Sequence, residues 1–275
     1  MTPDTSILMC PPEHFDVAYV INPWMTGNLR RIDAPAARRQ WRALYDRVVR
    51  LATVRLVRAA ADAPDMVFTA NAALVRGRSC VLARFRHEER QGEEPYFAEW
   101  FLEKGYAVHR CGPELYFEGA GDALFDRAAP LLWMGYGHRS VAGAQNYVAA
   151  LLTAAGDAVE VVTLELIDAR FYHLDTCFCP LEGGFLLYYP PAFSAASLLA
   201  IEARVPAHRR IACDAGDALA FACNAINIDT TLIVNHLSDT LADTLAARGF
   251  TVETSDLSEF VKAGGAAKCL TLALE

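Results

Sequence analysis

The sequence predicts one closed α/β domain, with strands around a central axis and helices outside them. Helical patterns begin near residues 35, 89, 140, 194 and 238, so a structural unit of roughly 50 residues occurs five times. Each unit joins one helix to two or three short strands, which cannot bury their faces alone. Pro and Gly breaks separate the units without a long linker, so we expect residues 1–275 to form a single domain that closes on itself. An open α/β sheet is the alternative, but the Gly-rich phosphate loop expected after its first strand is missing.

The predicted elements follow the same order in each repeat. The first repeat has short strands at 7–10 and 16–22, then a loop, and a helix at about 34–56 with Pro35 in its first turn, a position that suits proline. The other strands are predicted at 66–75, 80–85, 107–111, 131–137, 159–166, 173–181, 184–190, 209–214, 226–234 and 251–256, and the other helices at about 93–104, 140–155, 194–204 and 238–248.

Composition narrows the range of partners. With 53% hydrophobic residues the chain can bury a large core, and its net charge of −8 argues against binding of nucleic acid. No stretch reaches the roughly 20 apolar residues that span a bilayer, and residues 1–10 lack the basic start of a secretory signal. We therefore expect a cytoplasmic protein that acts on a small molecule, with a homo-oligomer left open.

The cysteines argue against disulfides and a metal. Eight cysteines are scattered without a paired C-x-x-C spacing, which is typical of reduced thiols. The closest group is His173 with Cys177 and Cys179, which would share a face if they lay on one strand, but no fourth zinc ligand is evident. We expect neither a metal nor an organic cofactor.

A run of small residues near the end of the chain is a candidate pocket floor. Residues 263–267 read Ala-Gly-Gly-Ala-Ala, and such residues let a ligand approach the backbone closely. Cys269 follows, and the charge of Lys268 beside it would favour the thiolate, the reactive form of a cysteine. Most cysteines in such chains are small buried hydrophobic residues. A catalytic Cys269 therefore needs partners from elsewhere in the sequence.

Four other stretches carry polar residues where apolar ones are expected. They contain Asn71 at the end of a predicted strand, Glu118 before Gly-Ala-Gly, Arg139 at a predicted helix start, and His173 with Asp175 two positions apart on one face of a predicted strand. Each has an ordinary alternative: Gly-Ala-Gly is a common tight turn, a histidine can be satisfied by backbone in the core, and an arginine can pair with a surface carboxylate. Their occurrence together favours a catalytic site.

The same stretches carry a family resemblance. In this order, MVFTANAALV, FEGAGD, GYGHRS, FYHLDTC and AGGAAKCLTLAL resemble the guanidine-modifying enzymes, which are arginine deiminases, dimethylargininases and amidinotransferases. The segment from Leu8 to Met25 is more narrowly similar to the arginine dihydrolase domain of cyanobacteria, and the likeness covers nearly the whole chain. The resemblance implies a five-bladed α/β propeller, the pentein fold, in agreement with the five repeats.

The resemblance also implies the reacting groups. It makes Cys269 the nucleophile and His173 the general acid and base, with Glu118 as a further catalytic residue. Glu118 and Asp175 would accept hydrogen bonds from the planar guanidinium, whose N–H groups match carboxylates.

Four more residues are expected to hold the rest of the substrate. By the same resemblance, Arg90 and Arg139 would bind the α-carboxylate, and Asn22 and Asn71 would line the reacting end. The second catalytic domain that follows in the cyanobacterial protein is absent from this sequence, so no built-in downstream step is expected.

The predicted chemistry is covalent. The Cys269 sulfur adds to the guanidinium carbon, His173 protonates the departing ammonia, and water activated by His173 then hydrolyses the thiouronium, giving citrulline from arginine. Arginine deiminases have an Asp at the end of the motif that contains Asn71, and its charge repels the oxygen of a neutral ureido group. An Asn both donates and accepts. We therefore predict an arginine dihydrolase that attacks citrulline again and releases ornithine, a second ammonia and carbon dioxide.

Alternatives remain within and outside enzymes. A dimethylargininase or an arginine deiminase would use the same Cys269, His173 and Glu118, and an amidinotransferase would pass the amidino group to an amine. A ribosome anti-association factor shares the five-bladed fold as a binding module without a catalytic cysteine. The joint presence of the three residues in family motifs argues against such a module.

Overall fold

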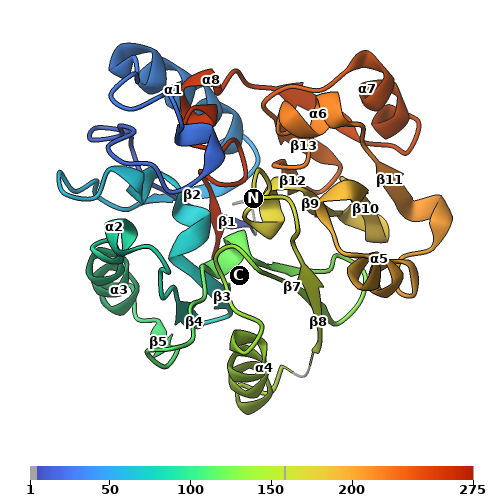
Figure 1. Ribbon diagram of the computed structural model, residues 1–275, viewed down its shortest axis with the longest axis horizontal. Helices are drawn as coiled ribbons and strands as arrows, with labels where there is room; N and C mark the ends of the chain where they lie inside the picture. Colours follow the sequence, from blue (N-terminus) through green and yellow to red (C-terminus); the bar gives the residue numbers. More distant parts are fainter. Residues whose placement is uncertain (1–4, 158, 275) are drawn as a thin grey trace.

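Five small sheets surround one axis in the computed structural model, which describes residues 5–157 and 159–274 (Figure 1). We number them as blades 1 to 5. The strands are, in blade 1, β15 (Leu272–Ala273), β1 (Ser6–Met9) and β2 (Thr53–Leu56); in blade 2, β3 (Ala73–Arg76), β4 (Ser79–Leu82) and β5 (Ala107–Arg110); in blade 3, β6 (Ala123–Phe125), β7 (Leu131–Tyr136) and β8 (Glu160–Glu165); in blade 4, β9 (Phe178–Leu181), β10 (Phe185–Tyr188) and β11 (Arg210–Ala212); and in blade 5, β12 (Ile226–Ile228), β13 (Thr231–Val234) and β14 (Thr251–Thr254).

Each blade repeats one topology. The first strand named for each blade is the inner strand, and it pairs antiparallel with the middle strand, which pairs parallel with the outer strand. A parallel pair needs a crossover, and a helix supplies it in every blade. These helices are α1 (Ala34–Val48), α3 (Glu94–Glu103), α4 (Ala144–Ala154), α5 (Ala195–Glu202) and α7 (Asp239–Ala246), with the shorter α2 (Glu88–Gln91), α6 (Ala215–Leu219) and α8 (Ser258–Val261) between them. The predicted five-bladed α/β propeller is confirmed.

Both ends of the described chain complete blade 1. β15 pairs antiparallel with β1 through Ile7 opposite Ala273 and Leu8 opposite Leu272. The ring therefore closes through backbone hydrogen bonds between segments that are far apart in the sequence.

Local signals explain where the helices begin. The side chains of Asp33, Ser194 and Ser238 accept hydrogen bonds from N–H groups in the first turns of α1, α5 and α7, which have no partner within the helix.

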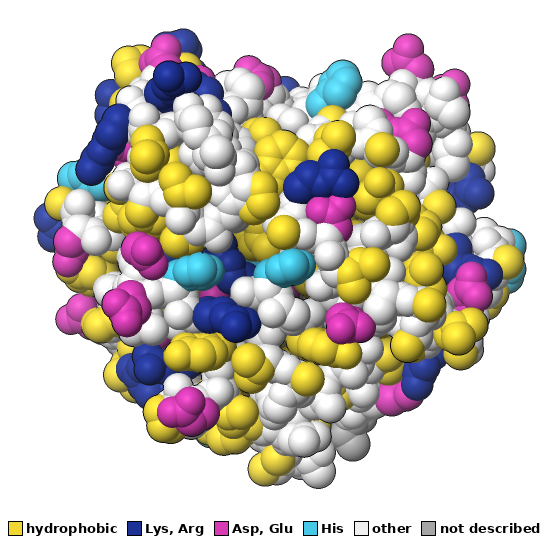
Figure 2. Space-filling view, in the orientation of Figure 1, with side chains coloured by type: hydrophobic (Ala, Val, Ile, Leu, Met, Phe, Trp, Pro, Cys, Tyr) yellow, Lys and Arg dark blue, Asp and Glu magenta, His cyan; other side chains and the backbone are white. Residues whose placement is uncertain are grey.

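None of the helices in the described ranges combines the length and apolar composition that a membrane crossing requires. Acidic and basic side chains are interspersed with hydrophobic ones over the face seen in Figure 2.

Two predictions for the first repeat are wrong. Residues 16–22 form no strand, because their neighbour is a loop rather than a sheet edge; the carbonyl of Val17 accepts a hydrogen bond from the N–H of Arg30 at 2.9 Å. The helix predicted to reach residue 56 ends at Val48, because the β-branched segment that begins at Thr53 pairs with β1 as strand β2.

Two predicted strands begin too early. Most of residues 64–72 and residues 174–176 form 3₁₀ turns, and the strands start only at Ala73 and Phe178. Nearly all residues of these turns are buried, so they show no alternation of buried and exposed positions that would distinguish them from a buried strand. His173 and Asp175 consequently do not share a strand face, although both remain close to the axis.

Candidate active site

Five turns, one before each inner strand, bring polar side chains to one end of the axis. They are the 3₁₀ turns Thr69–Ala72, Gly119–Gly121 and Leu174–Thr176 and the turns at 221–224 and 267–270. Their polar residues occupy matching positions: Asn71 and Asn224 precede β3 and β12 by two residues, Asp175 and Cys269 precede β9 and β15 by three, and Glu118 and His173 precede β6 and β9 by five. Every blade therefore contributes to the site.

A buried charged cluster links His173, Glu118 and Arg139. The Nε2 atom of His173 lies 2.7 Å from Oε2 of Glu118, which also accepts a hydrogen bond from Nη1 of Arg139 at 3.2 Å. Burial alone would raise the pKa of Glu118, but Arg139 and His173 outweigh burial and hold this pKa well below its usual range. The ionised Glu118 therefore fixes the imidazole of His173 in place.

The Cys269 sulfur lies between two groups that shift its pKa in opposite directions. It is 3.4 Å from Oδ2 of Asp175 and accepts a hydrogen bond from Nδ2 of Asn224 at 3.1 Å. Burial, followed by the negative charge of Asp175, raises the pKa of Cys269 well above the usual thiol range. In the free protein Cys269 is therefore a thiol that donates to Asp175.

The predicted effect of Lys268 on Cys269 is therefore wrong. Within the turn at 267–270, the side chain of Lys268 points into a cavity on the propeller axis, whereas Cys269 lines the active-site cavity. Lys268 acts instead on Asp175: burial raises the pKa of that carboxyl to about 6, and the ammonium opposes the rise. Two neighbouring residues thus serve different cavities.

Asn71 is held by a buried arginine. Oδ1 of Asn71 accepts a hydrogen bond from Nη1 of Arg90 at 2.9 Å, and its Nδ2 lies 3.5 Å from Nδ1 of His173. Arg90 also forms a two-point contact with Glu93, at 2.7 and 2.9 Å. The Oδ1 of Asn71 is therefore turned toward Arg90, and its Nδ2 donor faces the site.

The site is closed in this structure. The free space among Asn22, Asn71, Arg139, His173 and Cys269 and their neighbours is about 10 Å³, room for about one water molecule. Asn22 mainly joins two segments that close the cavity. Its Nδ2 donates to the carbonyl of Ala263 at 3.0 Å, and its Oδ1 accepts from the backbone N–H groups of Trp24 and Met25. A larger molecule can enter only if covering segments move apart.

Two buried residues of the site were not predicted from the sequence. Asn224 is fully buried and holds the turn of Cys269, since its Oδ1 accepts from the N–H groups of Ala266 and Cys269. Its one sequence signal is its position, which matches that of Asn71 in another repeat. Asp65 lines the cavity, and its Oδ1 has no hydrogen-bond partner among the described residues. A buried acceptor without a partner is costly, which points to a ligand group.

The zinc ligands considered from the sequence do not come together in the structure. The described ranges contain no group of three or more His, Cys, Asp or Glu side chains placed to hold a metal ion. His173 lines the active-site cavity while Cys179 lines the axial one, so they do not form the zinc group considered from sequence.

The fold and the site define a class of enzyme. A five-bladed α/β propeller presents a cysteine, a histidine bonded to an ionised carboxylate, and a second carboxylate beside the sulfur. These are the groups needed for covalent hydrolysis of a cationic substrate.

The comparison with known families agrees with this class. The family model of eukaryotic N,N-dimethylarginine dimethylhydrolase matches residues 31–275, and the chain belongs to this family. It is 38% identical over 265 residues to the N(G),N(G)-dimethylarginine dimethylaminohydrolase of Mycobacterium tuberculosis, covering 96% of this chain and 84% of that protein. The predicted family resemblance is confirmed.

A more similar relative is bifunctional. The chain is 56% identical over 272 residues to the arginine dihydrolase/ornithine cyclodeaminase ArgZ of Synechocystis, which covers 99% of this chain but only 38% of ArgZ. The crystal structure of the N-terminal domain of ArgZ, as a cysteine-to-serine mutant bound to substrate, matches with a TM-score of 0.96 at 55% identity over 98% of each chain. Another structure of that domain holds a covalent reaction intermediate.

Proposed function

We propose that this chain is an arginine dihydrolase that converts L-arginine and two waters to ornithine, two ammonia and carbon dioxide. The observation that carries the proposal is the orientation of Asn71, whose Oδ1 accepts from Arg90 while its Nδ2 donor lies toward His173. The similarity to ArgZ over nearly the whole chain supports it.

The first half of the reaction uses Cys269, His173 and Asp175. A substrate guanidinium brings positive charge next to Asp175 and Cys269, which offsets the burial that keeps the sulfur protonated. The sulfur loses its proton to His173 and adds to the guanidinium carbon. His173 returns the proton to the departing amine, so ammonia leaves and a thiouronium remains.

Water completes this half. His173 takes a proton as water adds to the thiouronium carbon, the C–S bond breaks, and citrulline forms. Glu118 keeps the imidazole oriented and stabilises its positive charge whenever it holds the proton. The closed cavity, with room for about one water, supports a hydrolytic fate over transfer to a larger amine.

The second half depends on Asn71. Its Nδ2 can donate to the ureido oxygen of citrulline, which keeps the neutral intermediate in place. Cys269 then attacks the ureido carbon, a second ammonia leaves, and water hydrolyses the thiocarbamate. The resulting N-carboxy-ornithine loses carbon dioxide to give ornithine.

The other end of the substrate needs a carboxylate and a cation. The unpaired Oδ1 of Asp65 is suited to accept from the α-ammonium. Arg139 remains the candidate for the α-carboxylate, and its Nη2 now bonds the carbonyl of Ile21 at 3.1 Å, which substrate would replace. The contact predicted for Arg90 stays a prediction; its bonds to Glu93 and Asn71 favour a supporting role.

Product analysis tests the proposal. The purified protein is incubated with L-arginine, and citrulline, ornithine, urea and ammonia are measured over time. Ornithine with two ammonia per arginine and no urea is expected, whereas citrulline with one ammonia would identify a deiminase.

Asn71→Asp should move the product towards citrulline, because a carboxylate repels the ureido oxygen. Asn146→Asp, the same change on the exposed side of α4, should leave the ratio unaltered; unchanged ornithine from Asn71→Asp would exclude this role for Asn71.

The family match supports one second candidate, a dimethylargininase. It would release dimethylamine and citrulline from asymmetric dimethylarginine by the same Cys269 chemistry. The added methyl groups need space beside the guanidinium that the tight cavity does not offer in this state. A kcat/KM for dimethylarginine above that for arginine would replace the first proposal by this one.

A further inference from the structure

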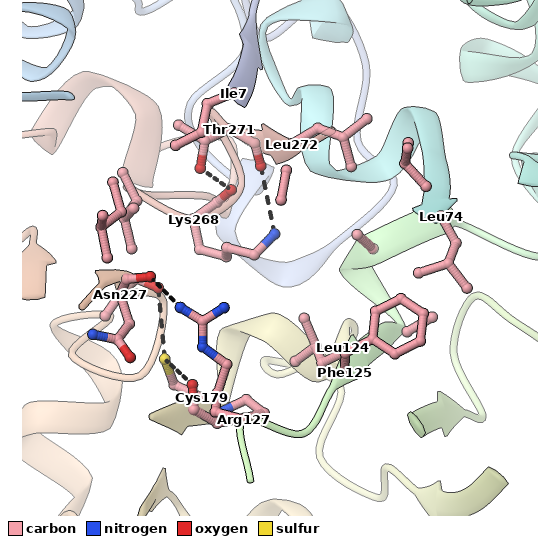
Figure 3. Close-up of a pocket in the computed structure, with 18 of the residues that line it drawn as sticks. Ile7, Leu74, Leu124, Phe125, Arg127, Cys179, Asn227, Lys268, Thr271 and Leu272 are labelled. Carbon is pink, nitrogen blue, oxygen red and sulfur yellow. Dashed lines mark hydrogen bonds between the residues drawn. The ribbon is translucent and has the colours of Figure 1, made fainter. Parts of the chain in front are cut away.

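A second cavity lies on the propeller axis behind the active site (Figure 3). Its volume is about 250 Å³, and among the described residues none lines both it and the active-site cavity. The inner strands β3, β6, β9, β12 and β15 form its walls. The proposed reaction makes no use of this space.

The walls are mainly apolar. Leu74, Leu124, Phe125, Ile226 and Leu272 come from four different blades and surround the cavity. Apolar walls with a few polar groups are typical of small-molecule sites, and this volume is slightly below their usual range. The cavity thus suits a small molecule with a hydrocarbon body.

Two positive charges face this cavity without a carboxylate partner. The Nζ of Lys268, which is partly buried, lies 3.4 Å from the carbonyl of Thr271, and Nη2 of Arg127, at the exposed rim, donates to the carbonyl of Asn227 at 2.8 Å. Within residues 5–157 and 159–274 no carboxylate comes within ion-pair distance of either cation.

The other charged groups of the cavity already have partners. Arg76 pairs with Asp157. The carboxylate of Asp126 accepts from the N–H groups of Ala128 and Ala129 and from the Trp133 indole. Asp126 keeps its negative charge, but the positive charges of Lys268 and Arg127 outnumber it. A partly buried ammonium with one long hydrogen bond favours an anionic partner.

We propose that the axial cavity is a second binding site, for a small organic carboxylate. Its carboxylate pairs with Lys268, Arg127 supplies a second positive charge at the rim, and its hydrocarbon body lies against the apolar walls. Lys268 also lowers the pKa of Asp175, so an anion bound there is electrostatically connected to the active site.

Calorimetric titration of the protein with 4-methylpentanoate tests the proposal independently of turnover, so the result stands whether or not the proposed activity is correct. We expect one carboxylate per chain, and no comparable binding of 4-methylpentanamide, acetate or inorganic phosphate, which lack the charge or the apolar body. The Cys269→Ser variant, which removes the sulfur from the active site, should keep this binding because the cavities are separate.

Two variants locate the site. Lys268→Gln should weaken binding at least about tenfold, since it removes a charge-assisted contact, and Arg127→Gln should weaken it less. Lys104→Gln, at an exposed position after α3, is the matched control and should bind like the wild type. No binding of 4-methylpentanoate, equal binding of the amide or of phosphate, loss of binding in Cys269→Ser, or wild-type affinity in both variants would each overturn the proposal.

Discussion

Asn224→Asp should reduce catalysis and leave the fold intact, because it replaces the side-chain NH2 group by an oxygen. The Oδ1 of Asn224 accepts from the N–H groups of Ala266 and Cys269 at 3.0 and 3.2 Å. Its Nδ2 donates to the carbonyl of Asp175 at 2.9 Å and to the Cys269 sulfur at 3.1 Å. The aspartate keeps the acceptor that holds the turn, but it faces the sulfur with a second acceptor instead of a donor.

The expected loss follows from the contact with the sulfur. A hydrogen bond to a charged group contributes about 1.5–3 kcal/mol, which corresponds to about 10- to 150-fold. We therefore expect kcat/KM for L-arginine to fall by at least this factor. Alkylation of Cys269 by iodoacetamide should also require a higher pH than in the wild type, because the added carboxylate disfavours the thiolate.

Asn224→Ala is the informative comparison. It removes all four side-chain bonds and leaves two buried N–H groups unpaired, at about 1–3 kcal/mol each, so the free energy of unfolding should fall by about 2–6 kcal/mol. Unfolding in urea and arginine turnover would be measured for both variants. Wild-type kcat/KM together with a wild-type alkylation profile in Asn224→Asp would refute the role assigned to the Nδ2 donor.

Burial raises the pKa of Asp175 to about 6 even though Lys268 opposes it, so this carboxylate is ionised above that pH and protonated below it. The KM for L-arginine should therefore rise as pH falls through about 6, and a flat KM from about pH 5 to about pH 8 would contradict a contact between Asp175 and the guanidinium. Glu118→Gln leaves the buried Arg139 without a counter-charge and should lower the free energy of unfolding by about 3–5 kcal/mol. Asp46→Asn, in an exposed pair on α1, should cost at most about 1 kcal/mol, and equal losses in the two variants would be inconsistent with this reasoning. Gly264→Ala forces an alanine to a φ of +88° with its Cβ 2.6 Å from the Tyr172 hydroxyl, and should cost about 1–3 kcal/mol in urea unfolding. Gly92→Ala has no atom within 4 Å of the new Cβ and should change stability by under about 1 kcal/mol; a similar loss there would argue against strain at Gly264.

The repeat was predictable because its signals are local. Asp33, Ser194 and Ser238 mark the starts of three crossover helices through contacts within one turn, and the strands between them are short and apolar. Counting these units was enough to predict a closed ring. The family resemblance added the residues that meet on its axis.

The turns around the axis were not predictable in the same way. Alternation along a strand arises because one face is buried, but the segments around Asn71 and His173 are buried on all sides, so turn and strand look alike. Asn224 could be found only by its position relative to β12, which requires the strand boundary. The opposite directions of Lys268 and Cys269 depend on the geometry of one turn, which neighbouring residue types do not specify.

The pairing of β15 with β1 has a consequence for the order in which the enzyme becomes active. Four of the five turns precede the turn that contains Cys269, and Cys269 lies only three residues before β15. As this domain is synthesised, Glu118, Arg139 and His173 would thus be in place before Cys269. Catalytic competence would appear in a single late step, when the last strand docks on the first, so activity reports that the ring is closed.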